Sequence, residues 1–109
     1  MGAESIEYIR SLPETKTIYS NGTDAIYFLT KRTVLPIPAR IDPSTGRNLD
    51  DFEEDMNAMC NDLIHNGAVL VYLDHITWRW YLPSKKELES LYKIPIRARL
   101  ADGAVYGLN

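Results

Sequence analysis

The chain has 109 residues, a formal net charge of −3 and a single cysteine. This length fits one domain with a continuous core, and one cysteine excludes both an intramolecular disulfide and a cysteine-based zinc site. The sequence contains neither a Lys/Arg-rich run of the kind that binds nucleic acid nor an apolar run approaching the ~20 residues that span a bilayer.

The chain is predicted to begin with a helix that is followed by a strand–turn–helix unit. Residues 4–12 have the apolar spacing of a short helix, which Pro13 ends. Residues 17–19 are β-branched or aromatic and favour a strand. The polar turn of residues 20–24 then stops the strand, and apolar residues recur at helical spacing over residues 25–29. Such a unit is typical of the start of an α/β sheet.

An extended segment, a loop and the longest helix are expected next. Residues 33–41 contain two prolines, which exclude a helix and remove ladder donors, so we expect an edge strand there. Residues 42–48 are rich in turn-forming residues and are the best candidate for a mobile loop. Residues 49–66 have one apolar helical face, and the acidic residues near their start suit the positive end of the helix dipole.

The second half of the chain contains the strongest strand signal. Residues 68–73, AVLVYL, form a continuous apolar run, which is typical of a strand buried on both faces at the centre of a parallel sheet. Residues 77–82 are aromatic and extended, with Trp78 and Trp80 on one face. We expect this pair to be core or cover residues, although paired aromatics also form platforms for a sugar ring or a partner protein.

The last elements are a capped helix and two short strands. Ser84 and Glu87 have the spacing of a capping box, and Asp102-Gly103 is a hairpin turn signal between strands at 94–100 and 104–108. The whole order predicts one α/β domain over residues 1–109. We expect a three-layer, Rossmann-like fold with a mainly parallel sheet, right-handed crossovers and a C-terminal antiparallel hairpin at one edge.

Polar groups follow several predicted strands, and in open α/β sheets ligands bind beyond the carboxyl ends of the strands. The groups are the 20–24 turn, Arg40 with Asp42, and Asp74 with His75. If the first strand and the 68–73 strand are neighbours, the first and last groups face one crevice. The predicted ligand-binding residues are Ser20, Asn21, Gly22, Thr23, Asp24, Asp74 and His75.

The motifs predict neither a cofactor nor a catalytic site. The turn has one glycine and matches neither GxxxxGK[ST] nor GxGxxG, so a specific nucleotide site is not expected. Asn21, Thr23 and Asp24 can each cap the following helix, whose free N–H groups can also meet an anion. The two histidines lack metal-ligand spacing, and GxSxG is absent. Cys60 lies on an apolar helical face, where a buried, inert thiol is expected.

One long segment resembles a known family. LPETKTIYSNGTDAIYFLTKR, with Pro36 and Pro38 after it, resembles the start of the soluble C-terminal domain of bacterial polytopic membrane glycosyltransferases similar to the protein O-mannosyltransferase (dolichyl-phosphate-mannose type) family. A buried "VVYF"-like strand and a closing "DG.IY" of that pattern match residues 68–73 and Asp102, Gly103, Val105 and Tyr106. These loose motifs mark a fold rather than an active site.

The resemblance implies a setting for the chain. In that family the catalytic acids lie in loops between membrane helices, a region that this sequence does not match, so no catalytic residue is carried over. The resemblance implies a soluble domain outside the cytoplasm, in the periplasm or at the cell surface. There it accompanies sugar transfer from a lipid-linked donor, beside the membrane-embedded remainder of a longer protein. The chain, which starts almost at once on a helix, is accordingly expected to be an excised domain.

Three functions remain open at this point. The first is a non-catalytic extracytoplasmic accessory domain of a membrane glycosyltransferase-like protein, which recognises a saccharide, an acceptor or a partner, or supports the membrane part. The second is a free-standing small α/β protein that binds an anionic or nucleotide-like ligand at the Ser20–Asp24 turn. The third is a small enzyme that uses Asp74 and His75. It ranks last because no nucleophile, metal set or cofactor motif accompanies these two residues.

Overall fold

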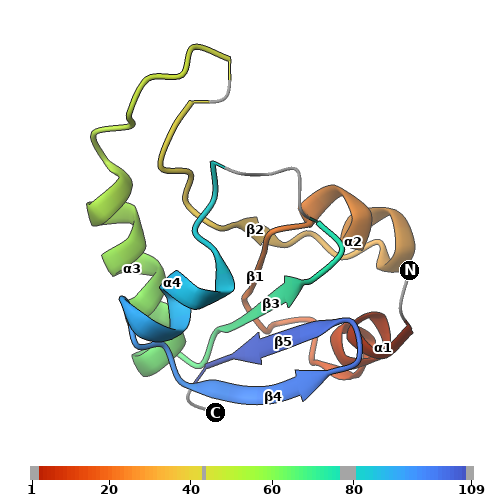
Figure 1. Ribbon diagram of the computed structural model, residues 1–109. Helices are drawn as coiled ribbons and strands as arrows, with labels where there is room; N and C mark the ends of the chain where they lie inside the picture. Colours follow the sequence, from red (N-terminus) through yellow and green to blue (C-terminus); the bar gives the residue numbers. More distant parts are fainter. Residues whose placement is uncertain (1–2, 43, 77–80, 108–109) are drawn as a thin grey trace.

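The computed structural model describes residues 3–42, 44–76 and 81–107, and these form one α/β domain around a mixed sheet (Figure 1). The sheet has five strands in the order β2-β1-β3-β5-β4. The elements in chain order are α1 (Ala3–Ser11), β1 (Ile18–Ser20), α2 (Thr23–Thr30), β2 (Leu35–Pro36), α3 (Phe52–His65), β3 (Val69–Leu73), α4 (Lys85–Ser90), β4 (Ile96–Leu100) and β5 (Gly103–Tyr106).

The sheet combines a parallel and an antiparallel part. β1 lies between β2 and β3 and is parallel to both, with Ile18 opposite Val69 and Ser20 opposite Val71. β3 pairs with β5 on its other side in antiparallel fashion, and β4 completes the hairpin at the edge. The edge position of β2 and of the C-terminal hairpin is confirmed. The sheet is not mainly parallel, however, because the strand next to β3 in the sheet belongs to the hairpin.

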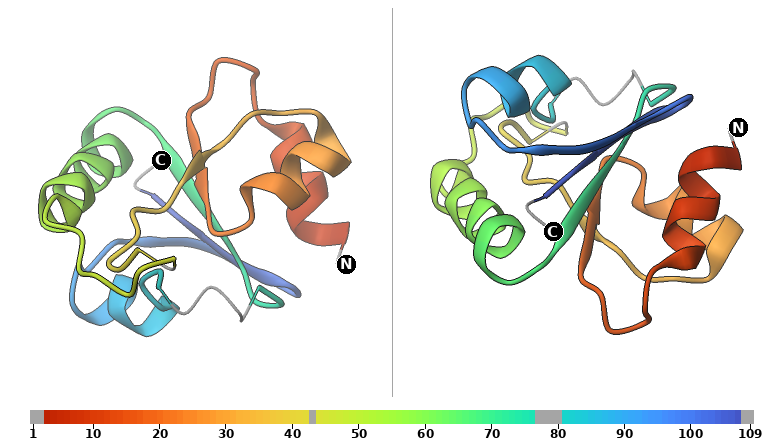
Figure 2. Two further views of the ribbon diagram at one scale, coloured as in Figure 1. Left: turned by 90° about the horizontal axis from the view of Figure 1, so that it is seen from above. Right: turned by 90° about the horizontal axis from the view of Figure 1, so that it is seen from below.

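Helices cover both faces of the sheet, and each face has its own hydrophobic cluster (Figure 2). Alternate residues of β3 point to opposite faces, as the pleat of a strand requires. Val69 and Val71 pack with Ile9 of α1 and Ile26 of α2. The other cluster contains Leu70 of β3 with buried residues of α3 and α4, among them Met56, Leu63 and Leu88. The continuous apolar run of β3 is therefore explained by burial on both sides.

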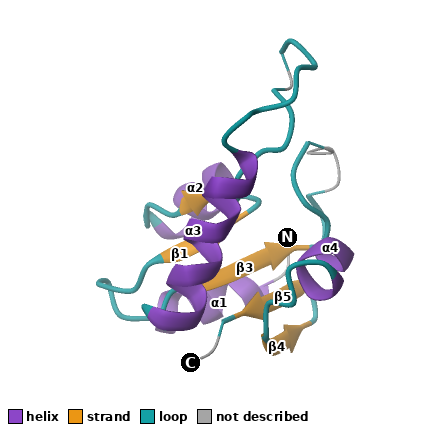
Figure 3. Ribbon diagram, turned by 90° about the vertical axis from the view of Figure 1, so that its left-hand side faces the viewer, coloured by secondary structure: helices purple, strands orange, loops and turns teal. Residues whose placement is uncertain are grey.

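The described residues between β2 and α3 form a loop that projects away from the sheet (Figures 1 and 3). Ile41 and Asn48 form an antiparallel bridge, and the Asp42 carboxylate accepts bonds from the Ser44 amide and hydroxyl. The Leu49 amide donates to the Arg40 carbonyl at 2.9 Å. Because residue 49 takes part in this pairing, α3 begins at Phe52 rather than at the predicted residue 49.

The C-terminal part agrees with the predicted capping box and corrects the predicted turn. Ser84 and Glu87 form both bonds of the box at the start of α4. In the hairpin Leu100 pairs with Gly103, so Gly103 is the first residue of β5 and not part of the turn. A Cβ at this position would lie 2.0 Å from the carbonyl oxygen of Tyr72. The glycine is needed for the close approach of β3 rather than for turn geometry.

Candidate functional site

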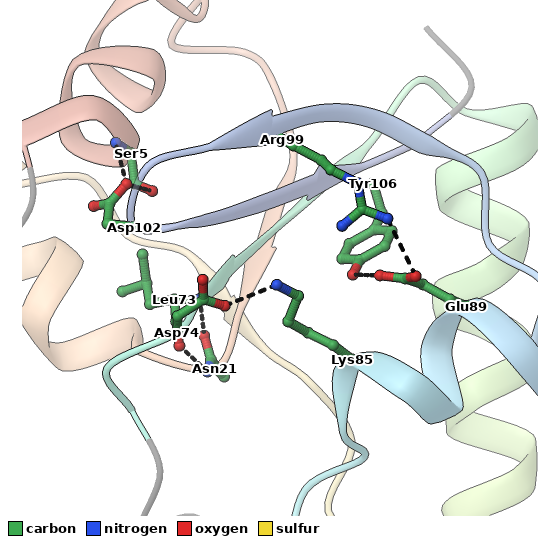
Figure 4. A network of polar contacts seen from close by, with 9 residues as sticks. All are labelled: Ser5, Asn21, Leu73, Asp74, Lys85, Glu89, Arg99, Asp102 and Tyr106. Carbon is green, nitrogen blue, oxygen red and sulfur yellow. Dashed lines mark hydrogen bonds and ion pairs between the residues drawn. The ribbon is translucent and has the colours of Figure 1, made fainter.

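Two of the three predicted polar groups meet at the carboxyl ends of β1 and β3. Because these strands are parallel neighbours, Asn21 and Asp74 follow them at the same edge of the sheet. The Asn21 side chain reaches across to Leu73, immediately before Asp74 (Figure 4). Its oxygen accepts a bond from the Leu73 amide at 2.8 Å, and its nitrogen donates to the Leu73 carbonyl at 3.0 Å.

These two bonds give Asn21 a structural role. The residue is 2% exposed, and its amide continues the β1–β3 pairing beyond the point where β1 ends. Only an amide side chain supplies a donor and an acceptor together in this geometry. The prediction that Asn21 can cap α2 is wrong, because its side-chain oxygen accepts a bond from the Leu73 amide and no side chain caps α2. The N-cap of α2 is Gly22, which has no side-chain acceptor.

The neighbours of Asn21 pack closely against the sheet. The Ser20 hydroxyl oxygen is buried with its residue and accepts a bond from the Gly22 amide at 3.1 Å. A Cβ added to Gly22 would lie 2.8 Å from the Leu73 Cδ1 atom. The first half of the predicted binding turn is therefore part of the core. Only Thr23, half-buried, and Asp24, exposed, have side chains nearer to solvent.

Asp74 and His75 lie at the surface, beyond the end of β3. The Asp74 carboxylate accepts a bond from the Lys85 ammonium of α4 at 2.9 Å (Figure 4). Within residues 3–42, 44–76 and 81–107, no hydrogen bond or ion pair joins Asp74 to His75. The two side chains thus share a location, and the structure does not arrange them as a base held by an orienting carboxylate.

Arg40 and Asp42, the third predicted group, hold the projecting loop in place. Arg40 forms an ion pair with Glu87 of α4, and its guanidinium carbon lies 5.1 Å from the centroid of the Phe52 ring. The hydrogen bond from Arg40 lowers the pKa of Glu87 below its usual value. Bonds from Ser44 likewise lower the pKa of Asp42. In the described part of the chain, neither residue bonds to the 20–24 turn.

The sequence did not indicate two tyrosine–carboxylate bonds that connect the sheet to its helices. The Tyr19 hydroxyl donates to Asp62 of α3 at 2.5 Å. The Tyr106 hydroxyl donates to Glu89 of α4 at 2.6 Å, as Figure 4 shows. Burial, reinforced by the neighbouring carboxylate, raises the pKa of both phenols. A tyrosine in a buried strand indicates that its hydroxyl needs a hydrogen-bond partner. The sequence does not show which residue this partner is, because it lies far away along the chain.

The remaining candidates from the sequence are the single cysteine, a metal site and the tryptophan pair. Cys60 is half-buried on α3, and burial raises the pKa of its thiol. Among the described residues, no three His, Cys, Asp or Glu side chains lie close enough to hold a metal ion. Trp78 and Trp80, the predicted aromatic pair, lie outside the described residues.

The fold and this edge of the sheet define the class of the protein, an α/β domain with a mixed five-stranded sheet. Comparisons of the chain with models of protein families, with curated proteins and with solved structures gave no match. In the described ranges, every helix is too short or too polar to cross a bilayer.

Proposed function

We propose that the chain is a non-catalytic extracytoplasmic accessory domain of a bacterial membrane glycosyltransferase-like protein. The observation that carries this proposal is the use of polar side chains at the carboxyl edge of the sheet. At that edge Asn21 holds Leu73 and Lys85 holds Asp74, and nearer the projecting loop Arg40 holds Glu87. A general acid or base must lie within hydrogen-bond reach of the substrate. Side chains that already join one element to another support a scaffolding or binding role instead.

The proposal includes the finer features of the fold and its partners. Helices on both faces of the sheet and the parallel β2-β1-β3 unit support a reduced three-layer, Rossmann-like arrangement. The partners that the resemblance implies are the membrane-embedded remainder of a longer protein and a saccharide or protein acceptor. The domain then presents its surface to these partners, while sugar transfer takes place in the membrane part.

Fractionation of the native product tests this proposal. An antibody raised against the chain is used on membrane and soluble fractions of cells of the source organism. A band several times larger than 12.5 kDa in the membrane fraction is the expected result. A soluble band near 12.5 kDa would overturn the proposal. The alternative would then be a free-standing protein that binds an anionic or nucleotide-like ligand at the Ser20–Asp24 turn.

A double substitution in the native protein tests the non-catalytic part separately. The variant D74N/H75Q removes the carboxylate and the imidazole while keeping the size of both side chains. We expect the rate of sugar transfer to stay within about twofold of the unmodified protein, because neither group would take part in the reaction. A loss of about a hundredfold or more, the effect of removing a general acid or base, would show that this edge is catalytic.

A further inference from the structure

The outer face of α2 leaves two neighbouring aromatic side chains uncovered. Tyr27 is 53% exposed and Phe28 is 75% exposed, the largest exposed fraction of any large apolar side chain among the described residues. The inner face of the same helix is buried through Ile26. Aromatic rings are among the groups that gain most from leaving water, so a protruding adjacent pair indicates a contact surface.

Positive charge gathers at the end of the same helix. A hollow of about 280 Å³ next to the end of α2 is lined by Lys16, Lys31, Arg32 and Thr33, with Glu14 as the one carboxylate. The local balance is therefore three cations to one anion, in a chain whose net charge is −3. The sign of the charge at this place is opposite to that of the molecule as a whole.

Hydrogen bonds explain the position of the arginines here but not that of the lysines. The Arg32 guanidinium donates to three carbonyls at the end of α1, namely those of Ile9, Leu12 and Pro13. Arg10 donates in the same way to the Leu29 carbonyl of α2. Such bonds are the usual task of a cation at a helix C-terminus. By contrast, the ammonium groups of Lys16 and Lys31 form no hydrogen bond or ion pair within the described part of the chain.

Lys31 joins the charge to the rings. It follows α2 in the left-handed region, with a φ of 61°, where glycine is normally favoured. Its ammonium nitrogen lies 5.8 Å from the ring centroids of both Tyr27 and Phe28. A lysine thus occupies a strained position that places its charge directly beside two exposed rings. We call Lys16, Tyr27, Phe28, Lys31 and Arg32 the α2 surface.

We propose that the α2 surface docks on an anionic phospholipid bilayer. Protruding aromatic rings suit the headgroup region of a bilayer, where aromatic side chains concentrate, and lysines beside them bind anionic headgroups. The rings protrude from a helix instead of lining a cleft, which favours a soft, deformable lipid surface over a preformed protein groove. This inference uses only the residues of this surface and holds or fails independently of the glycosyltransferase proposal.

Vesicle co-sedimentation of the folded chain tests the inference. Vesicles of phosphatidylcholine alone are compared with vesicles that contain about one third phosphatidylglycerol. We expect binding to the anionic vesicles at low ionic strength, weaker binding in about 0.15 M salt because the Debye length shortens, and little binding to phosphatidylcholine alone. Equal binding to both kinds of vesicle, or to neither, would overturn the proposal.

Two pairs of variants make the test specific to this surface. Lys31 and Lys93 both have left-handed backbone conformations, and Phe28 and Leu91 are both strongly exposed. Lys93 and Leu91 follow α4, on the opposite side of the sheet from α2 (Figure 2). K31G should weaken vesicle binding about fivefold and K93G should leave it unchanged. F28S should weaken it roughly tenfold and L91S should not.

The outcomes that contradict the inference are distinct. If K31G and K93G weaken binding equally, attraction is a general charge effect and the α2 surface has no special role. If millimolar inorganic phosphate competes with vesicles through Lys16 and Lys31, the hollow is a small-anion site and not a bilayer contact. If the chain binds a protein partner through Phe28 but no vesicle, the surface is a protein interface. Far-UV circular dichroism of each variant establishes that it is folded.

Discussion

Two polar regions of this domain differ in how their side chains are used. At the carboxyl edge of β1 and β3, the Asn21 side-chain amide forms hydrogen bonds with the Leu73 main chain, and Asp74 forms an ion pair with Lys85. At the end of α2, the ammonium groups of Lys16 and Lys31 have no polar partner among the described residues, and Phe28 is exposed beside Lys31. At the edge where α/β folds usually bind ligands, these polar groups form bonds within the domain. At the end of α2, the two ammonium groups do not.

The comparison shows that residue type and topological position are not enough to identify a binding site. It also matters whether the polar atoms are buried and already hydrogen-bonded. An asparagine after a strand and a lysine after a helix are equally ordinary in a sequence. Burial and existing bonds decide which of them is available to a partner. The following changes test this contrast, beginning with the largest expected effect.

Substitution of Asn21 should have the largest effect on stability. N21A leaves the buried amide of Leu73 without a partner, and an unsatisfied group of this kind costs about 1–3 kcal/mol. It also removes one of the two bonds to the Leu73 carbonyl, which still accepts from the Ile76 amide at 3.3 Å. We expect the free energy of unfolding to fall by about 3 kcal/mol in urea denaturation. The matched control is N66A, which removes an exposed asparagine that bonds Asp62 and should cost less than about 1 kcal/mol. Equal losses in the two variants would show that Asn21 is not a structural residue.

Gly22 should tolerate a methyl group poorly. G22A places its Cβ 2.8 Å from the Leu73 Cδ1 atom in the core, and we expect a loss of about 1–2 kcal/mol from overpacking. L73V removes the atom in conflict, so the double variant G22A/L73V should be more stable than the sum of the single effects predicts. Additive losses in thermal or urea denaturation would mean that the turn does not pack on β3 as described.

The Arg40–Glu87 pair should make stability depend on pH in the acid range. Arg40 lowers the pKa of Glu87 in the folded state, so the carboxylate stabilises the fold above its unfolded pKa and loses this contribution as the pH falls. E87Q keeps the capping box, because glutamine also serves at that position. Both side chains are partly exposed, so we expect E87Q to cost about 1 kcal/mol or less at pH 7.

Urea denaturation as a function of pH measures this effect. The difference in unfolding free energy between the unmodified chain and E87Q should shrink as the pH falls below the ordinary glutamate pKa of about 4.3, and it should disappear in stronger acid. A difference that stays constant from neutral to acid pH would show that the charge of Glu87 is not used to hold the loop.

Lys31 should show the smallest change in stability, and in the opposite direction. K31G relieves a left-handed lysine, and we expect a gain of roughly 0.5 kcal/mol in the unfolding free energy, because the flexibility of glycine in the unfolded chain offsets part of the relief. K93G should give a similar gain. A loss of stability in K31G would mean that the lysine is needed by the fold itself, which would contradict its assignment to a contact surface.

Local signals account for what the sequence predicted correctly. The apolar run of β3, the capping box at Ser84 and Glu87, and the prolines around the edge strand β2 each act within a few residues. Their physical causes are burial, N–H capping and the missing proline donor, so the elements follow from the residues alone.

Long-range pairing accounts for what was missed. The bonds of Asn21 reach Leu73, and the partner of Tyr19 is Asp62, so neither appears in any local window. The sheet is mixed because β5 lies beside β3. The hydrophobic periodicity of a strand does not indicate which strand will be its neighbour. The availability of Lys31 likewise depends on which neighbours surround it once the chain has folded.

An amide chemical-shift titration with anionic bicelles tests the contrast between the two regions most directly, because one spectrum reports on both. We predict shifts that are largest over residues 14–16 and 27–33, around the α2 surface, and small over residues 20–24 and 74–75. Shifts concentrated in the 20–24 turn and at Asp74 and His75, with the end of α2 unaffected, would contradict the account. The carboxyl edge of the sheet would then be the binding site, despite its internal bonds.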